Sequence, residues 1–76
     1  MDMRRLVGQN VKRIRLEKKL TQEQFSDISG FSQQYLSGLE SGRRNPTVVT
    51  LYEIAKALGV SHLDLLEPPP RQKRSN

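Results

Sequence analysis

Apolar residues recur every three or four positions along most of this chain, which is the spacing of a helix with one buried face. A helix is predicted over about residues 5–19, where Val7, Val11 and Ile14 recur at helical spacing and Leu20 closes the segment. Another is predicted over residues 48–58, with an apolar face formed by Val48, Leu51, Ile54, Ala55 and Leu58. No segment alternates between apolar and polar residues as a strand does, so the chain is predicted to be all-α.

Two shorter helices are predicted between these by the residues at their ends. Thr21, with Gln24 three positions later, has the arrangement of a capping box that opens a helix, and Gly30 is suited to end it. Ser32 is suited to cap a third helix, which Gly42 ends. We expect the apolar side chains of these helices to pack inward, in a core that includes Phe25, Ile28, Phe31, Leu36, Leu39, Leu51, Ile54 and Leu58.

The end of the chain differs in composition from the rest. A short fifth helical turn is predicted from Ser61, and it contains Leu63, Leu65 and Leu66. The final PPPRQKRSN cannot continue it, because three prolines and polar basic residues favour an extended, disordered segment. We therefore expect one domain over residues 1–67 and a basic tail over residues 68–76.

The connection between the second and third predicted helices is unusually short. Only Gly30 and Phe31 separate the end of one helix from the capping residue of the next. A bend that tight makes two short helices cross steeply, which is the geometry of a helix-turn-helix, whose second helix can lie in the major groove of DNA. The pattern alone is not specific, since other small helical bundles contain it.

The positive charge is concentrated at the two ends of the chain. The formal net charge is +5, and residues 4–19 hold seven cations and one anion, whereas residues 20–67 hold three cations and six anions. The tail adds Arg71, Lys73 and Arg74. This distribution indicates contact with a polyanion on one side, although a solvated, solubilising charge run would look the same.

Several functional classes lack their necessary residues. The chain has no cysteine, one histidine (His62) and no glycine-rich phosphate loop, so we predict neither an enzyme nor a metal or cofactor site. No apolar run approaches the roughly 20 residues of a membrane span, and no apolar signal segment follows the basic N-terminus. We expect a soluble cytoplasmic protein without a small-molecule ligand.

Specific motifs resemble those of a known family. VGQNVKRIRLEKKLTQEQF, SGFSQQYLSGLESGRRNPTVVTLYEIAKALGV and SHLDLL are similar to the phage repressor/Cro-type helix-turn-helix family, also called the XRE family, from Val7 to Leu66. The resemblance implies a compact five-helix bundle of the phage-repressor type, with the helix-turn-helix formed by helices 2 and 3 and a recognition helix over about residues 32–41.

The resemblance also implies roles for individual residues. Gln33, Gln34 and Ser37 match positions that contact bases, and glutamine can bond both N6 and N7 of an adenine. One of the two glutamines could instead only cap or solvate the helix. The expected DNA phosphate contacts are Thr21, Gln22, Ser32, Tyr35, Arg43, Arg44 and Asn45, while weaker candidates are Arg4, Arg5, Lys12 and Arg13.

Other positions are expected to be structural. Arg15 and Glu40 match positions that form an ion pair between the first and third helices in related proteins. Gly38 departs from good helix formation, because glycine is unfavourable inside a helix. It could permit close approach to DNA, relieve crowding, or have no role.

These observations predict a sequence-specific, double-stranded-DNA-binding transcriptional regulator. We expect it to act as a homodimer on a pseudo-palindromic operator, with Leu63, Leu65 and Leu66 at the dimer interface. RNA polymerase is a further candidate partner. The alternative is a protein-interaction adaptor that retains the fold without specific DNA binding.

Overall fold

The computed structural model describes residues 2–69 and contains five helices. They are α1 (Met3–Glu17), α2 (Gln22–Ser29), α3 (Gln33–Glu40), α4 (Val48–Leu58) and α5 (Leu63–Leu66). No strand occurs within the described range, so the predicted all-α class and five-helix arrangement are confirmed. The predicted tail falls mainly outside it, because residues 70–76 are not described.

The ends of the helices follow the capping signals of the sequence. Thr21 accepts a hydrogen bond from the backbone N–H of Gln24, whose side chain accepts one from the Thr21 N–H in return. Ser32 caps α3 and Thr47 caps α4 in the same way, each through its hydroxyl oxygen. Gly30, at φ 82°, closes α2 in a left-handed conformation that costs glycine nothing. Helix α1 begins and ends about two residues earlier than expected, because Asp2 caps its start and Glu17 is its last residue.

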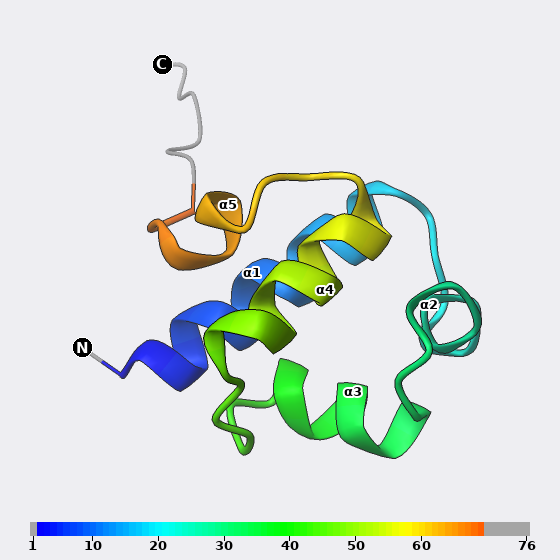
Figure 1. Ribbon diagram of the computed structural model, residues 1–76, viewed down its shortest axis with the longest axis horizontal. Helices are drawn as coiled ribbons and strands as arrows, with labels where there is room; N and C mark the ends of the chain where they lie inside the picture. Colours follow the sequence, from blue (N-terminus) through cyan, green and yellow to red (C-terminus); the bar gives the residue numbers. More distant parts are fainter. Residues whose placement is uncertain (1, 70–76) are drawn as a thin grey trace.

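The helices enclose one apolar core. Helix α1 packs against α3 and α5, and α2 packs against α3 and α4. Helix α2 is seen end-on in Figure 1 while α3 runs across the lower edge, so the two helices cross steeply. The buried core consists of Val7, Val11, Ile14, Phe25, Leu36, Leu39, Leu51, Ile54, Ala55, Leu58 and Leu65.

Two residues expected in the core lie elsewhere. Ile28 is 54% exposed, so its assignment to the core is wrong. It lies in the last turn of an eight-residue helix whose only buried side chain is Phe25. Phe31 is half-buried and packs at the edge of the core, where its ring stacks on Tyr35 with 5.3 Å between centroids.

A buried amide connects the two ends of the chain. Asn10 lies on the inward face of α1 and is fully buried. Its Nδ2 donates to the carbonyl oxygens of Leu65 at 3.0 Å and Glu67 at 2.7 Å, while its Oδ1 accepts from Arg13. Both amide hydrogens and the amide oxygen are therefore satisfied, and α5 is fixed to α1 through its own backbone.

Candidate nucleic-acid interface

Helix α3 presents a polar face to solvent. Leu36 and Leu39 are buried against the core and fix the rotation of the helix, which leaves Gln33, Gln34 and Ser37 exposed. None of these three carries a charge, and each can donate and accept hydrogen bonds. The structure therefore groups all three predicted base-contact residues on one exposed surface.

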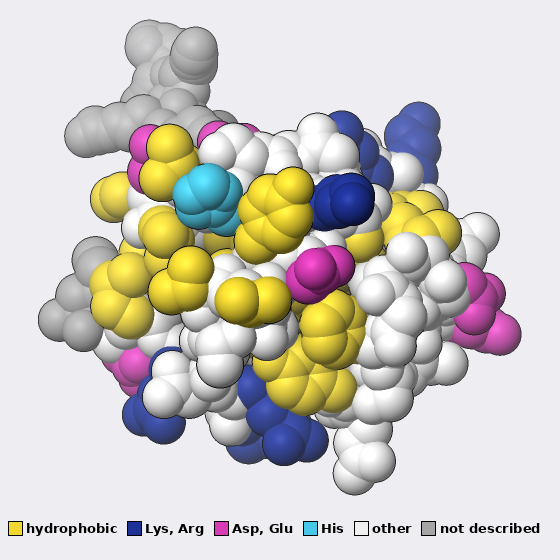
Figure 2. All heavy atoms as spheres, viewed as in Figure 1, with side chains coloured by type: hydrophobic (Ala, Val, Ile, Leu, Met, Phe, Trp, Pro, Cys, Tyr) yellow, Lys and Arg dark blue, Asp and Glu magenta, His cyan; other side chains and the backbone are white. Residues whose placement is uncertain are grey.

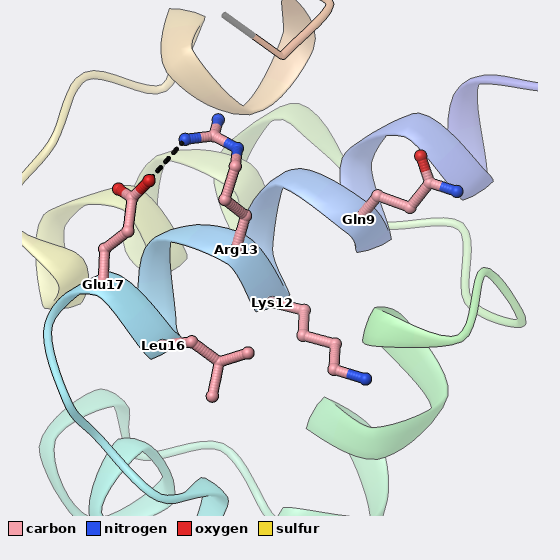
Figure 3. A pocket seen from close by; sticks show the side chains of 5 residues that line it. All are labelled: Gln9, Lys12, Arg13, Leu16 and Glu17. Atoms are coloured by element: carbon pink, nitrogen blue, oxygen red, sulfur yellow. Dashed lines mark hydrogen bonds and ion pairs between the residues drawn. The ribbon is translucent and has the colours of Figure 1, made fainter. Parts of the chain in front are cut away.

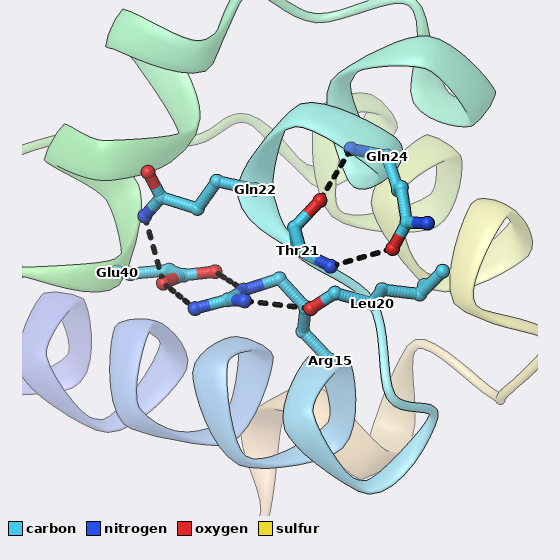
Figure 4. Close-up of polar contacts among 6 residues, drawn as sticks. All are labelled: Arg15, Leu20, Thr21, Gln22, Gln24 and Glu40. Carbon is cyan, nitrogen blue, oxygen red and sulfur yellow. Dashed lines mark hydrogen bonds and ion pairs between the residues drawn. The ribbon is translucent and has the colours of Figure 1, made fainter.

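A buried ion pair holds α3 on α1. Arg15 Nε lies 2.6 Å from Glu40 Oε2, and a second guanidinium nitrogen lies 3.1 Å from Glu40 Oε1 (Figure 4). The side chains are only 8% and 4% exposed. Arg15 also donates to the Leu20 carbonyl at 2.8 Å, and Gln22 Nε2 donates to Glu40 at 3.1 Å. Two parallel charge-assisted bonds give the pair a fixed geometry, so the network sets α3 relative to both α1 and the start of α2.

The residues predicted to contact phosphates surround this face. Thr21 and Ser32 are exposed at the N-termini of α2 and α3, and Gln22 is half-buried at the seam between α2 and α3. Arg43 and Asn45 are exposed in the loop after α3, as is Arg44, although the side chain of Arg44 folds back onto the helix. Tyr35 is half-buried under that guanidinium group.

Of two neighbouring cations on α1, Lys12 points toward α3 and Arg13 points away from it (Figure 3). Lys12 extends from α1 toward α3, whereas Arg13 turns the other way to pair with Glu17 at 3.3 Å (Figure 3). Lys12 also lines a hollow of about 190 Å³ together with Gln22, Ser37, Glu40 and Ser41. Lys12 is thus better placed beside α3 than sequence reasoning indicated, and Ser41 was missed there.

A separate apolar surface lies over α4 and α5. Val48 and Val49 are 78% and 67% exposed, and Tyr52 and Leu63 are each more than half exposed. Figure 2 shows hydrophobic side chains gathered around the histidine, and Val48, Val49 and Tyr52 line a hollow together with His62, which Leu63 follows in the chain. We call Val48, Val49, Tyr52 and Leu63 the α4–α5 patch.

Of the three leucines predicted at a dimer interface, Leu65 is wrongly assigned. Leu65 is fully buried in the core, so it cannot meet a partner, and Leu66 is half-buried against that core. Only Leu63 of the three is exposed. A helix of four residues makes one turn, and its neighbouring leucines necessarily point in different directions.

Residues 2–69 contain neither a metal-binding cluster nor a membrane-spanning helix. No group of three or more His, Asp or Glu side chains there is placed to hold a metal ion. No helix in this part of the chain has both the length and the apolar character needed to cross a membrane.

Known proteins share this arrangement. Residues 11–65 match the family described as Helix-turn-helix. The chain belongs to this family. The protein y4dJ of Sinorhizobium fredii, described as an uncharacterized HTH-type transcriptional regulator, is 69% identical over 68 residues, which cover 90% of this chain and 88% of the relative.

Solved structures agree with the family in fold. The hypothetical transcription factor NHTF from Neisseria has a TM-score of 0.85 and 32% identity, covering 90% of this chain and 78% of that one. The restriction–modification controller protein C.Esp1396I, solved as a tetramer with its natural 35-base-pair operator, has a TM-score of 0.78 and 37% identity, covering 86% of each chain. This helix-turn-helix protein is thus similar to transcriptional regulators over most of its length, and the predicted family and fold are confirmed.

Proposed function

We propose that this helix-turn-helix protein regulates transcription by binding a specific double-stranded DNA sequence with α3 in the major groove. The observation that carries the proposal is the face of α3, where uncharged amide and hydroxyl groups are exposed on a helix held by a buried ion pair. Amides that donate and accept can distinguish base edges, while neighbouring cations attract every sequence alike.

Residues around the α3 face are proposed to contact the phosphate backbone of the DNA. We assign backbone phosphate contacts to the exposed helix N-termini and the following loop, and to one cation of α1, namely Thr21, Gln22, Ser32, Tyr35, Arg43, Asn45 and Lys12. Free N–H groups at the start of a helix favour an anion there. Gln22 has one amide hydrogen committed to Glu40, so its other N–H is the one available to a phosphate.

The second part of the proposal is a homodimer formed through the α4–α5 patch. Exposed aliphatic and aromatic side chains next to one another are typical of a surface that another protein covers. A twofold axis would bring the same patch of two copies together and present two α3 helices to successive turns of one DNA face. The similarity to C.Esp1396I, which is a tetramer on its operator, supports assembly on DNA.

The regulatory mechanism would follow from operator occupancy. A bound dimer blocks RNA polymerase where the sites overlap and can recruit it where they adjoin. Neither outcome requires catalysis, a cofactor or a small ligand, and both take place where the chromosome lies, in the cytoplasm. We further propose residues 1–67 as the DNA-binding unit and residues 68–76 as a tail outside it.

One experiment tests the proposal as a whole. Duplexes bound by the full chain are selected from a random pool, and the mass of the complex is measured at several salt concentrations. We expect an inverted repeat, two copies per duplex, and affinity that falls steeply as salt rises. Absence of any enriched sequence, with no dependence on salt, would favour the protein-interaction adaptor.

A further inference from the structure

Arg44 belongs to the loop after α3, but its side chain folds back and packs on α3. Its guanidinium carbon lies 5.4 Å from the centroid of the Tyr35 ring, in cation–π geometry. That ring in turn stacks on Phe31. Arg44 therefore rests on an aromatic platform built by the start of α3 and the turn before it.

Gly38 makes room for this arrangement. A methyl group added at Gly38 would lie 2.8 Å from Arg44 Nε and 3.2 Å from Arg44 Cγ. Gly38 is buried although the inward side of α3 is taken by Leu36 and Leu39, and the three atoms nearest to an added methyl group all belong to the side chain of Arg44. The glycine is thus explained by an arginine six residues further along the chain.

The position of Gly38 on the helix decides what Arg44 can reach. Residues four apart are neighbours on a helix surface, so Gly38 lies directly after Gln34 on the solvent side. An arginine that crosses Gly38 therefore lies on the same side of α3 as Gln34, which is the face assigned to base contacts. Arg43, its neighbour in the same loop, is exposed and has no such platform among the described contacts.

We propose that Arg44 is a specificity-determining residue that bonds O6 and N7 of a guanine, with Gly38 as the residue that positions it. This inference rests on the proposed DNA binding and replaces the phosphate role predicted for Arg44. A planar guanidinium presents two parallel donors, and guanine presents two acceptors on its major-groove edge. Holding the side chain against Tyr35 beforehand reduces the rotamer freedom that binding would otherwise remove.

The first test compares Arg44→Lys with Arg43→Lys, which both keep their charge. Affinity is measured for the duplex selected by the wild-type protein and for a set of its single-base-pair variants. We expect Arg44→Lys to bind the selected duplex roughly 5- to 150-fold more weakly. We also expect it to lose discrimination at one G·C pair per half-site only. Arg43→Lys should leave discrimination at every position unchanged. A uniform loss across all duplexes for Arg44→Lys would overturn the inference.

The second test uses Gly38→Ala, measured in the wild-type and Arg44→Lys backgrounds. Alanine favours the helix more than glycine, and the clash is with a side chain that can swing away. The melting temperature should therefore be unchanged or higher, while discrimination falls at the same G·C pair. No further loss should occur when Arg44 is already lysine. A lower melting temperature, or a loss at a different base pair, would contradict the positioning role. Failure of the wild-type protein to select any duplex would overturn both this inference and the proposed function.

Discussion

The α3 face and the α4–α5 patch are opposite in chemistry although the same small core supports both. The α3 face exposes amides and a hydroxyl near cations, whereas the α4–α5 patch exposes two valines, a tyrosine and a leucine. Base edges offer hydrogen-bonding groups, and a second copy of this chain offers the same apolar surface in return. The difference fits the two partners that we propose, DNA for the α3 face and a second protomer for the α4–α5 patch.

The two surfaces are nevertheless fixed by similar means. Arg15 of α1 holds α3 through Glu40, and Asn10 of α1 holds α5 through the backbone oxygens of Leu65 and Glu67. Each support is a buried polar group whose partners are satisfied. Helix α1 thus holds both α3 and α5, the helix that contributes Leu63 to the α4–α5 patch.

Loss of the α4–α5 patch should have the largest effect on DNA binding. Val49→Glu adds a charge to an exposed position, so the monomer should stay folded while the dimer separates. Joining two binding units typically raises affinity by about 10²- to 10⁴-fold, and we expect a loss of that order. The matched control is Ile28→Glu, which changes an exposed aliphatic residue outside the patch. The mass of this variant in solution should still be that of a dimer. A dimeric Val49→Glu protein would show that the patch is not the interface.

Loss of the ion pair should affect the fold more than any other change near α3. Glu40→Ala leaves the Arg15 guanidinium buried without its carboxylate, which costs roughly 3–5 kcal/mol. A chain of 76 residues typically has about 4–11 kcal/mol of stability in total. Denaturant unfolding measures the change, with the exposed Glu23→Ala as a control expected to stay within about 0.5 kcal/mol. Equal stability of the two variants would rule out this role for the pair.

Loss of the Asn10 hydrogen bonds to α5 should reduce the free energy of unfolding by less than loss of the ion pair. Asn10→Ala leaves the carbonyl oxygens of Leu65 and Glu67 without their donor, and we expect roughly 1–3 kcal/mol of lost stability. Because α5 carries Leu63, dimerisation should weaken as well. Unfolding and sedimentation measurements on one sample separate the two effects. A variant with weaker folding and an unchanged dimer constant would break the proposed link between α1 and the patch.

The base-reading role of the amides predicts a local effect. Gln34→Ala should cost about 1–3 kcal/mol of binding free energy at one base pair and relax the choice of base there. Titration against single-base-pair variants of the selected duplex measures this. Asp27→Ala, an exposed substitution outside α3, serves as a control. A Gln34→Ala protein with the same preference at every position would indicate that Gln34 only solvates the helix.

The smallest predicted change in DNA affinity is that caused by substitution of Arg43, in the loop after α3. Arg43→Ala should weaken binding to all duplexes about equally, because a phosphate contact carries no sequence information. The slope of log affinity against log salt should become shallower by about 0.9 for one lost contact. Selective loss at one base pair would instead place Arg43 in the groove.

Much of this fold could be predicted from the sequence because its signals are local. Helix spacing and capping residues such as Thr21, Ser32 and Thr47 need only neighbours in the chain, and the structure places them as expected. The exposure of Ile28 and the burial of Leu65 depend on packing between distant segments, and the reach of Arg44 depends on how the loop folds back onto α3, so periodicity could not assign them. Asn10 had a usable signal, since it lies three residues after Val7, on the apolar side of α1.

The proposed recognition is tested most directly by determining which groove of the DNA α3 occupies. Methylation by dimethyl sulfate modifies guanine N7 in the major groove and adenine N3 in the minor groove of a selected duplex. We expect the wild-type protein to protect guanine N7 atoms in two patches, about one helical turn apart on one face of the duplex. Gln34→Ala should still protect both patches. Protection confined to adenine N3 atoms, with the major groove equally reactive in free and bound DNA, would contradict recognition by this helix.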